Sequence, residues 1–599
     1  MAPVRLVQVL TRELLGAGWR RVWYRDIHRG SYLLSDFPPP RPVTNTSYVH
    51  GTCDLPLNSK TVHQCLLETT DRIPDVEAVV FPRSNIRKTF SQLIDDVESL
   101  AAGLVALGLK KGDRVGMWGP NSYEWILVQF ATARAGIILV SVNPAYQARE
   151  LEYVLKKVKC SALVFPSQFK TQKYYELLSE ICPELETSPA GDLQCKKLPD
   201  LHSVIVLDKR HPGTFLFQDV MEAGNSSSVQ QLQDFQKNIS CDDPINIQFT
   251  SGTTGSPKGA TLSHHNIVNN ASLGGRRMGY NWKKGVRTAL PVPLYHCLGS
   301  VIGGMVMAVY GTTLVFPSPG YDVRALLEAI SIEKCNCMYG TPTMYIDLLS
   351  QPDFAAHTST LTSGVIAGSI APPEIMKKIF TETAMKEIVI GYGTTENSPV
   401  TFLGFPHDNF IRKTETVGHI VSHTEAKVVD TNTGQIVPLN APGELLIRGY
   451  CVMLEYWGDP EKTKEVMTPA NWYRTGDIAT MDEYGYCRIV GRCKDMIIRG
   501  GENIYPAEVE DFLHTHPSIL EAQVIGVKDE RMGEEVCACI RLYDNKTATA
   551  DDIKEFCKGK ISHFKIPRYI VFVKDYPLTV SGKIQKYKLR ERMEQELNL

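Results

Sequence analysis

After about residue 90, stretches whose apolar positions are typical of strands alternate with stretches whose apolar positions are typical of helices. The apolar run at 114–118 ends at a glycine-proline-asparagine turn and predicts a buried strand. Ser122 then predicts the N-cap of a helix that ends at Ala135, and residues 137–142 predict the next strand. Strand, helix and strand in this order predict a parallel or mixed sheet covered by helices. The same alternation recurs at 161–165, 203–207, 312–316 and 387–392.

The pattern changes near the end of the chain. The stretch GRCKDMIIRGGENIYPAEVEDFL at 491–513 passes from a charged turn to a short strand, a glycine pair and a helix. We therefore predict an α/β protein with a large N-terminal domain of mixed sheets and flanking helices over 60–491. A hinge at 492–495 and a small, mobile α+β domain over 496–599 follow it. Residues 218–242, rich in Ser, Gln and Asn, are the segment most typical of a linker.

Composition excludes some classes of protein. Hydrophobic residues make up 43% and charged residues 22%, which is usual for a globular protein, and the formal net charge of −2 gives no electrostatic argument for a nucleic-acid partner. No apolar run reaches the length of a membrane-spanning helix, so we expect no transmembrane segment. Fifteen cysteines without CxxC or zinc-type spacing predict reduced, packed thiols of an intracellular protein.

The first forty residues differ from the rest. Six arginines stand against two acids in the first thirty residues, and apolar residues recur there at helical spacing. This pattern is typical of a mitochondrial transit peptide, which we predict over 1–40, in a protein of the matrix. The alternative is a basic N-terminal helix that stays attached.

The stretch TSGTTGSPKG, which begins at residue 250, concentrates hydroxyls, glycines and one lysine. Its glycine spacing departs from the Walker pattern, and strand-like residues precede and follow it. We predict a loop between two strands that binds phosphate through N–H groups, hydroxyls and the lysine rather than through a helix dipole. The alternative is a flexible polar hairpin. The candidate phosphate-binding residues in this loop are Thr250, Ser251, Gly252, Thr253, Thr254, Gly255, Ser256, Pro257 and Lys258.

Five further motifs follow in order: GYGTTE at 391–396, YRTGD at 473–477, GRCKD at 491–495, GGENIYPAEVE at 500–510 and PLTVSGKIQK at 577–586. With the loop, they resemble the adenylate-forming superfamily of acyl-CoA synthetases, firefly-type luciferases and peptide-synthetase adenylation domains. The resemblance extends from residue 60 onward. It implies that a carboxylate attacks ATP to give acyl-adenylate and pyrophosphate, and that the thiol of CoA then displaces AMP.

The resemblance also implies roles for single residues around ATP. Glu396 would hold Mg²⁺, which prefers one or two carboxylates plus phosphate oxygens. Thr395 would contact phosphate, and Tyr392 would lie against adenine. Asp477 and Arg492 would bind the ribose and phosphate side. Lys583 would orient the α-phosphate and the attacking carboxylate, and so Lys583, Glu396 and Thr395 are the expected catalytic residues.

Other positions concern CoA and the acyl group. By resemblance, Gly500 and Gly501 line the path of CoA, and Lys494 is the pivot on which the small domain rotates between the two steps. His296, Gly368 and Gly393 are expected at the acyl pocket. Gly393 stands where members restricted to acetate carry a tryptophan, which favours a longer substrate. The chain is most similar to mitochondrial medium-chain fatty acid ligases.

Four alternatives remain open at this point. A kinase or P-loop ATPase would release ADP rather than AMP and pyrophosphate. A luciferase or a ligase that loads carrier proteins would share the first step without CoA. A short-chain or aryl acid would replace the fatty acid. An inactive lipid-sensing or scaffold protein would keep only the fold. We expect the small molecules fatty acid, ATP and CoA as partners.

Overall fold

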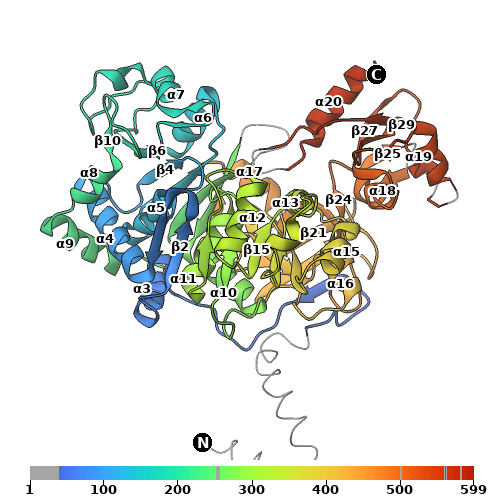
Figure 1. Ribbon diagram of the computed structural model, residues 1–599, viewed down its shortest axis with the longest axis horizontal. Coiled ribbons are helices and arrows are strands. Elements are labelled where there is room, and N and C mark those ends of the chain that lie inside the picture. Colours follow the sequence, from blue (N-terminus) through green and yellow to red (C-terminus); the bar gives the residue numbers. More distant parts are fainter. Residues whose placement is uncertain (1–38, 251–256, 500–501, 559, 562, 580–582) are drawn as a thin grey trace, which may run out of the picture.

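The computed structural model describes residues 39–250, 257–499, 502–558, 560–561, 563–579 and 583–599. Figure 1 shows a large body that holds most of the chain and a smaller C-terminal domain, in red, at one side of it. Residues 1–38 of the expected transit peptide lie outside the described part. Among the described helices, none has the length and apolar character needed to cross a membrane.

The first large sheet begins the α/β body. Within the described residues its strands are, in spatial order, β10 (Phe215–Leu216), β9 (Ser203–Val206), β6 (Ala162–Phe165), β4 (Arg114–Trp118), β5 (Ile138–Val142), β11 (Pro244–Thr250), β12 (Lys258–Ser263) and β22 (Glu455–Tyr456). The pairings from β10 to β11 are parallel, and the last two are antiparallel. The mixed sheet is thus confirmed.

The helix α5 (Tyr123–Ala135) connects β4 to β5 as predicted. The Ser122 side chain accepts a hydrogen bond from the backbone N–H of Trp125 and so caps the helix. Gly136, at φ +68°, ends it in the left-handed conformation, where glycine carries no steric penalty.

The second large sheet is also mixed. Its described strands are, in order, β19 (His419–Ile420), β18 (Val400–Leu403), β17 (Glu387–Gly393), β16 (Ser363–Ile366), β15 (Cys337–Gly340), β13 (Arg287–Ala289), β14 (Thr313–Val315), β2 (Glu77–Phe81) and β3 (Ile86–Thr89). One apolar cluster includes residues of both sheets and of the helices between them, so the two halves of the large body share a core.

Helices flank both sheets (Figure 1). They are α3 (Val62–Arg72), α4 (Phe90–Ala106), α6 (Ala148–Val158), α7 (Tyr174–Ile181), α10 (His264–Arg277), α11 (Val306–Tyr310), α12 (Val323–Ile332), α13 (Pro342–Leu349), α14 (Phe354–His357), α15 (Pro373–Glu382), α16 (Phe410–Glu415) and α17 (Pro460–Val466). The interpretation of 218–242 as a linker is wrong. This region forms α8 (Phe217–Glu222) and α9 (Ser226–Lys237), because Leu232 of α9 is buried in the shared core.

A third, antiparallel sheet completes the large body. It consists of β1 (Tyr48–His50), β20 (Thr424–Val429), β21 (Gly443–Gly449), β23 (Tyr473–Met481) and β24 (Cys487–Arg492). The following strand, β25 (Ile497–Arg499), pairs in a different sheet. The chain therefore leaves the large body just after Arg492.

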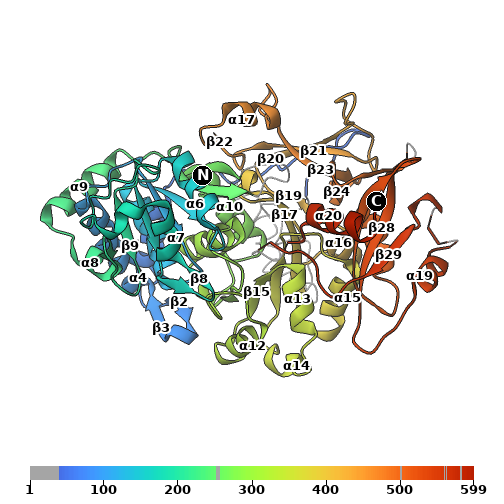
Figure 2. The same ribbon diagram turned by 90° about the horizontal axis from the view of Figure 1, so that it is seen from above.

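The C-terminal domain is α+β, with two apolar clusters of its own. Its described elements are β25, β26 (Glu502–Ile504), α18 (Pro506–Leu513), β27 (Ile519–Asp529), β28 (Gly533–Leu542), α19 (Ala550–Cys557), the short helix η5 (His563–Lys565), β29 (Tyr569–Phe572) and α20 (Lys586–Glu596). Figure 2 shows this domain beside the large body. Polar contacts join the two: Arg488 lies 3.4 Å from Asp511, and the Lys378 ammonium donates to the Tyr543 hydroxyl at 3.0 Å.

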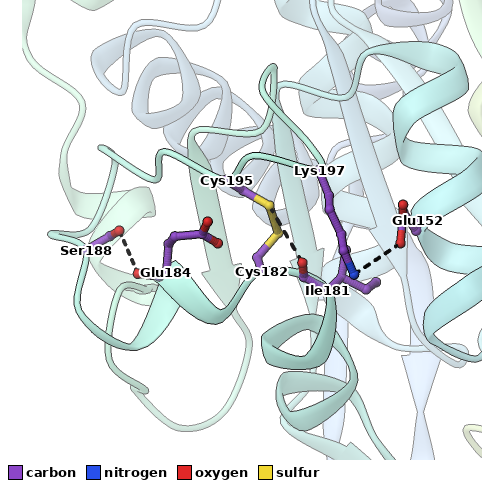
Figure 3. Close-up of a disulfide and its surroundings, with 7 residues drawn as sticks. All are labelled: Glu152, Ile181, Cys182, Glu184, Ser188, Cys195 and Lys197. Carbon is purple, nitrogen blue, oxygen red and sulfur yellow. Dashed lines mark hydrogen bonds and ion pairs between the residues drawn. A yellow bond between two sulfur atoms is a disulfide. The ribbon is translucent and has the colours of Figure 1, made fainter.

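The prediction that all cysteines are reduced is wrong at one place. Cys182 and Cys195 form a disulfide beside α7 (Figure 3). Both cysteines are buried, and they close a loop across a sequence separation of 13. Spacing alone did not reveal the pair, because a disulfide depends on the distance between the Cα atoms, here 5.4 Å.

Cys195→Ser should lower the free energy of unfolding by about 3 kcal/mol, because the open loop gains chain entropy in the unfolded state. Denaturant unfolding without reductant measures the loss. Dithiothreitol should lower the free energy of unfolding of the wild-type protein to that of the variant. Alkylation of the unreduced, denatured protein should label thirteen of the fifteen cysteines. Labelling of all fifteen would show that the disulfide does not form.

Candidate active site

The phosphate loop connects β11 to β12, which are antiparallel with Thr250 opposite Lys258. The predicted strand–loop–strand arrangement is thus confirmed. The Thr250 hydroxyl donates to the Lys258 carbonyl oxygen at 3.5 Å, and Pro257 precedes that lysine at the start of β12. The Lys258 ammonium lies 5.0 Å from the ring centroid of Tyr456. The other candidate ligands lie outside the described residues: Ser251, Gly252, Thr253, Thr254, Gly255 and Ser256.

Glu396 follows β17 in the short helix η4 (Thr395–Asn397) and is buried. Its Oε1 accepts a hydrogen bond from the Tyr456 hydroxyl at 2.7 Å, and its carbonyl oxygen accepts from the Met453 N–H at 2.7 Å. Tyr456 therefore touches both the acid and Lys258. Sequence reasoning missed this tyrosine, because it lies on β22, outside every motif.

Asp477 on β23 is a carboxylate with 5% of its surface exposed. It lies opposite Arg492 in the register of β23 and β24, with the arginine Nε 3.3 Å from Oδ1. The Tyr392 hydroxyl, from β17 of the other sheet, donates to Oδ2 at 2.5 Å. Burial raises the pKa of Asp477, and Arg492 and the tyrosine hydrogen bond oppose that shift. Three of the predicted ATP ligands thus meet at one carboxylate.

Lys583 comes from the small domain, in the loop before α20. Its backbone pairs with Thr579, since each N–H donates to an oxygen of the other residue, at 2.7 and 3.0 Å. The position that a Cβ would take on Gly368 of the large body lies 3.9 Å from the Lys583 Cε. Lys583 is exposed, but neighbouring protein atoms partly desolvate its ammonium and lower its pKa, and Arg492 acts in the same direction. The predicted catalytic lysine and acyl-pocket glycine therefore lie together.

His296 precedes the helix η3 (Leu298–Met305), and its ring lies 4.2 Å from that of Tyr295. Burial lowers the pKa of His296 to about 3, and the charge of Lys583 contributes. The imidazole is therefore neutral at physiological pH. The charge of Lys583 acts on this ring, so these two predicted site residues lie near each other.

Gly393 is explained by its backbone contact. A Cβ built on it would lie 1.7 Å from the carbonyl oxygen of Pro399, so any side chain here would displace the chain. The glycine is therefore needed for the close approach of two segments, and its identity alone does not measure the width of an acyl pocket.

Lys494 follows β24 between the two domains and is exposed. Desolvation and Arg492 lower its pKa to about 8. Gly500 and Gly501, the expected residues on the CoA path, lie outside the described residues.

Glu396 offers a single carboxylate for a metal. Within the described part of the chain, no group of three or more His, Cys, Asp or Glu side chains could enclose an ion. This donor set suits Mg²⁺ that is held mainly by phosphate oxygens and water, because that ion needs only one or two protein carboxylates. It does not suit a self-contained structural metal site.

Comparison with known proteins agrees with this geometry. The AMP-binding enzyme family matches residues 66–457, and its C-terminal domain matches residues 508–583. The chain belongs to the AMP-binding enzyme family. Its relatives include the protein of Danio rerio named medium-chain acyl-CoA ligase ACSF2, mitochondrial, which is 65% identical over 565 residues, 94% of this chain and 93% of that protein. The Homo sapiens protein of the same name is 58% identical over 592 residues, 98% of this chain and 96% of that protein.

Solved AMP-binding enzymes share the fold. The anthranilate CoA ligase AuaEII, in complex with anthranoyl-AMP, superposes with a TM-score of 0.79 and 28% sequence identity. The match covers 91% of this chain and 99% of that chain, so it includes the small domain. The two-domain, adenylate-forming architecture predicted from the motifs is thus confirmed.

The imidazole of His296 should stay neutral from pH 8 down to pH 5, because its pKa of about 3 lies well below that of an exposed histidine. NMR of histidine-labelled protein tests this, with His296→Asn to assign the resonance. A peptide histidine, which titrates near pH 6.5, is the control. A midpoint above pH 6 for this resonance would contradict the expectation.

Proposed function

We propose that the protein is an ATP-dependent fatty acid CoA ligase that converts a carboxylic acid, ATP and CoA into acyl-CoA, AMP and pyrophosphate. The observation that supports this most strongly is that Tyr392 and Arg492 meet at the buried carboxylate of Asp477. Lys583 of the small domain lies beside Gly368 of the large body, and its charge interacts with that of Asp477. Family membership and the names of relatives 58–65% identical point to the same reaction.

In the first step, a carboxylate oxygen of the acid attacks the α-phosphorus of ATP. The new P–O bond forms as the bond to the pyrophosphate oxygen breaks, and negative charge accumulates around the phosphorus. Lys583 would hold the attacking carboxylate against the phosphate and offset their repulsion. Asp477 would hold the ribose hydroxyls, Arg492 the phosphate side, and Tyr392 the adenine. The phosphate loop, with Lys258 and Thr395, would hold the departing pyrophosphate.

Glu396 would bind Mg²⁺ together with the phosphate oxygens. When bound, the ion neutralises phosphate charge and favours pyrophosphate as a leaving group. The Tyr456 hydroxyl keeps one carboxylate oxygen in a fixed direction, because it already donates to Oε1.

In the second step, the CoA sulfur attacks the acyl carbon, the C–O bond to AMP breaks, and the thiol proton is released. Lys583 is needed for the first step and, in our proposal, the segment with Gly500 and Gly501 for the second. The small domain would therefore rotate between the steps, with Lys494 as the pivot in a hinge at 492–495. The polar contacts between the domains favour such movement, since exposed or half-exposed ion pairs are weak.

We infer a medium-chain fatty acid as the substrate and the mitochondrial matrix as the location. The relatives' names support a medium chain and a mitochondrial location. The basic segment at 1–40 would be the transit peptide. His296, Gly368 and Gly393 would border the acyl group beside Lys583.

Exchange of labelled pyrophosphate into ATP tests the proposal. Straight-chain acids from C2 to C18 and an aryl acid are supplied one at a time as the carboxylic acid substrate. We expect maximal exchange with acids of medium length, without CoA, and acyl-CoA, AMP and pyrophosphate as products once CoA is added. Release of ADP would indicate a kinase-type reaction. Exchange that CoA does not convert to a thioester would indicate another acceptor.

Lys583→Ala should lower adenylate formation by about 10²- to 10³-fold, because it removes one preorganised charge at the reacting phosphate. Thioester formation from supplied acyl-adenylate should stay within about twofold of wild type, since the second step does not use this lysine. Lys588→Ala, an exposed lysine on the neighbouring helix α20, is the matched control. Equal loss of both half-reactions would contradict the rotation.

A further inference from the structure

Polar side chains follow one face of β11, the strand that leads into the phosphate loop. Asn246 and Gln248 alternate with Ile247 and Phe249, and all four are buried. The apolar pair packs in a separate cluster on the other face. A buried amide costs free energy unless its hydrogen bonds are satisfied. Two such amides in the core therefore call for specific partners.

Gln248 links β11 to the turn that starts at His296. Its Nε2 donates to the Ser300 hydroxyl at 3.0 Å, and its Oε1 accepts from the Cys297 thiol at 3.1 Å. The Ser300 hydroxyl then donates to the carbonyl oxygen of His296 at 3.1 Å. One side-chain amide thus holds two residues of this turn, and the chain of hydrogen bonds ends on His296 itself.

The turn is unusual in its backbone. Leu298–Met305 is a π-helix, a wide turn that is rare and is frequent at functional sites. A Cβ on Gly299 would lie 2.2 Å from the carbonyl oxygen of Pro293, so the turn already touches the preceding segment. The backbone contact fixes one side of the turn, and Gln248 holds the other.

A small cavity with a mainly apolar lining adjoins this link. Its volume is about 20 Å³, and Gln129, Asn246 and Ser300 contribute to its wall. The Gln129 Nε2 donates to the Ser300 carbonyl oxygen at 3.0 Å, while Gln129 Oε1 and Asn246 Oδ1 have no hydrogen-bond partner among the described residues. A cavity of this size has room for about one water, whose two O–H groups would satisfy both oxygens. The link therefore lies in a polar network that extends to α5.

We propose that Gln248 and Ser300 are positioning residues that set the distance between the acyl side of the site and the phosphate loop. Gln248 is two residues before Thr250, where that loop begins, and its partner Ser300 holds His296. In-line attack needs the carboxylate and the α-phosphate about 3–3.5 Å apart, so a small shift of the turn would weaken binding of the acid in the productive position. This inference rests on the proposed ligase reaction. It assigns the alignment of the acid with the α-phosphate to the buried amide of Gln248.

Gln248→Met and Ser300→Ala should each raise the KM for the fatty acid in pyrophosphate exchange by about tenfold, because each breaks the same link. The KM for ATP should stay within about twofold. Thr132→Val is the matched control, since it removes a buried hydroxyl that donates to carbonyl oxygens within α5. A variant that is merely destabilised would lose active protein without a change in either KM. An unchanged KM for the acid would overturn the proposal.

The double variant Gln248→Met/Ser300→Ala should be no more than about twofold worse than either single variant, because residues that act as one unit are not additive. Multiplication of the two effects would show that they act separately and would overturn the link. Cys297→Ser keeps a donor for Gln248 and should retain the wild-type KM, whereas Cys297→Ala should raise it. Equal KM values for the acid in these two variants would show that the Cys297 thiol does not contribute to the network.

A crystal structure of Gln248→Met tests the geometry without any assay. We expect the turn at His296 to shift relative to β11, with the phosphate-loop strands in place. An unmoved turn would overturn the positioning role even if the protein is an active ligase. An absence of exchange in the wild-type protein would instead count against the proposed function, so the two failures are distinguishable.

Discussion

The carboxylate of Asp477 is the point on which the arrangement of the molecule depends. It is buried, and a buried charge is tolerated only when hydrogen bonds and opposite charges balance it. Tyr392 reaches it from the second large sheet, and Arg492 reaches it from the last strand before the small domain. Lys583 acts on it from the small domain itself. Three structural units are thus held around one negative charge, at the place where our proposal puts the ribose of ATP.

The sequence predicted the repetitive parts of the fold well. The segment from β4 to β5 follows from apolar runs of strand length, a serine at the N-cap and a glycine where the helix ends, all of which act locally. The strand–loop–strand at the phosphate loop follows equally from residues next to one another. The motifs predicted the two-domain architecture through their resemblance to a family. They could be recognised because each consists of characteristic residues in one short stretch.

What the sequence did not reveal depends on distant contacts. Helix α9 is polar along most of its length, and its place in the fold is set by the burial of Leu232 against the shared core. Tyr456 is far from Glu396 in the chain and meets it only because β22 joins the edge of the first sheet. Gly393 appeared to report an open pocket, whereas its environment is the carbonyl oxygen of Pro399. The disulfide and the Gln248 network were missed for the same reason, because neither produces a recognisable pattern in a short stretch of sequence.

The placement of Lys583 on the small domain has a consequence for the release of products. Two hydrogen bonds join the lysine to Thr579 of the same domain, so it would move with that domain. Departure of that domain would withdraw a positive charge from a site that has just produced two anions. The same domain movement that admits the thiol would then weaken the binding of pyrophosphate. One movement would therefore serve both the second chemical step and the release of the first product.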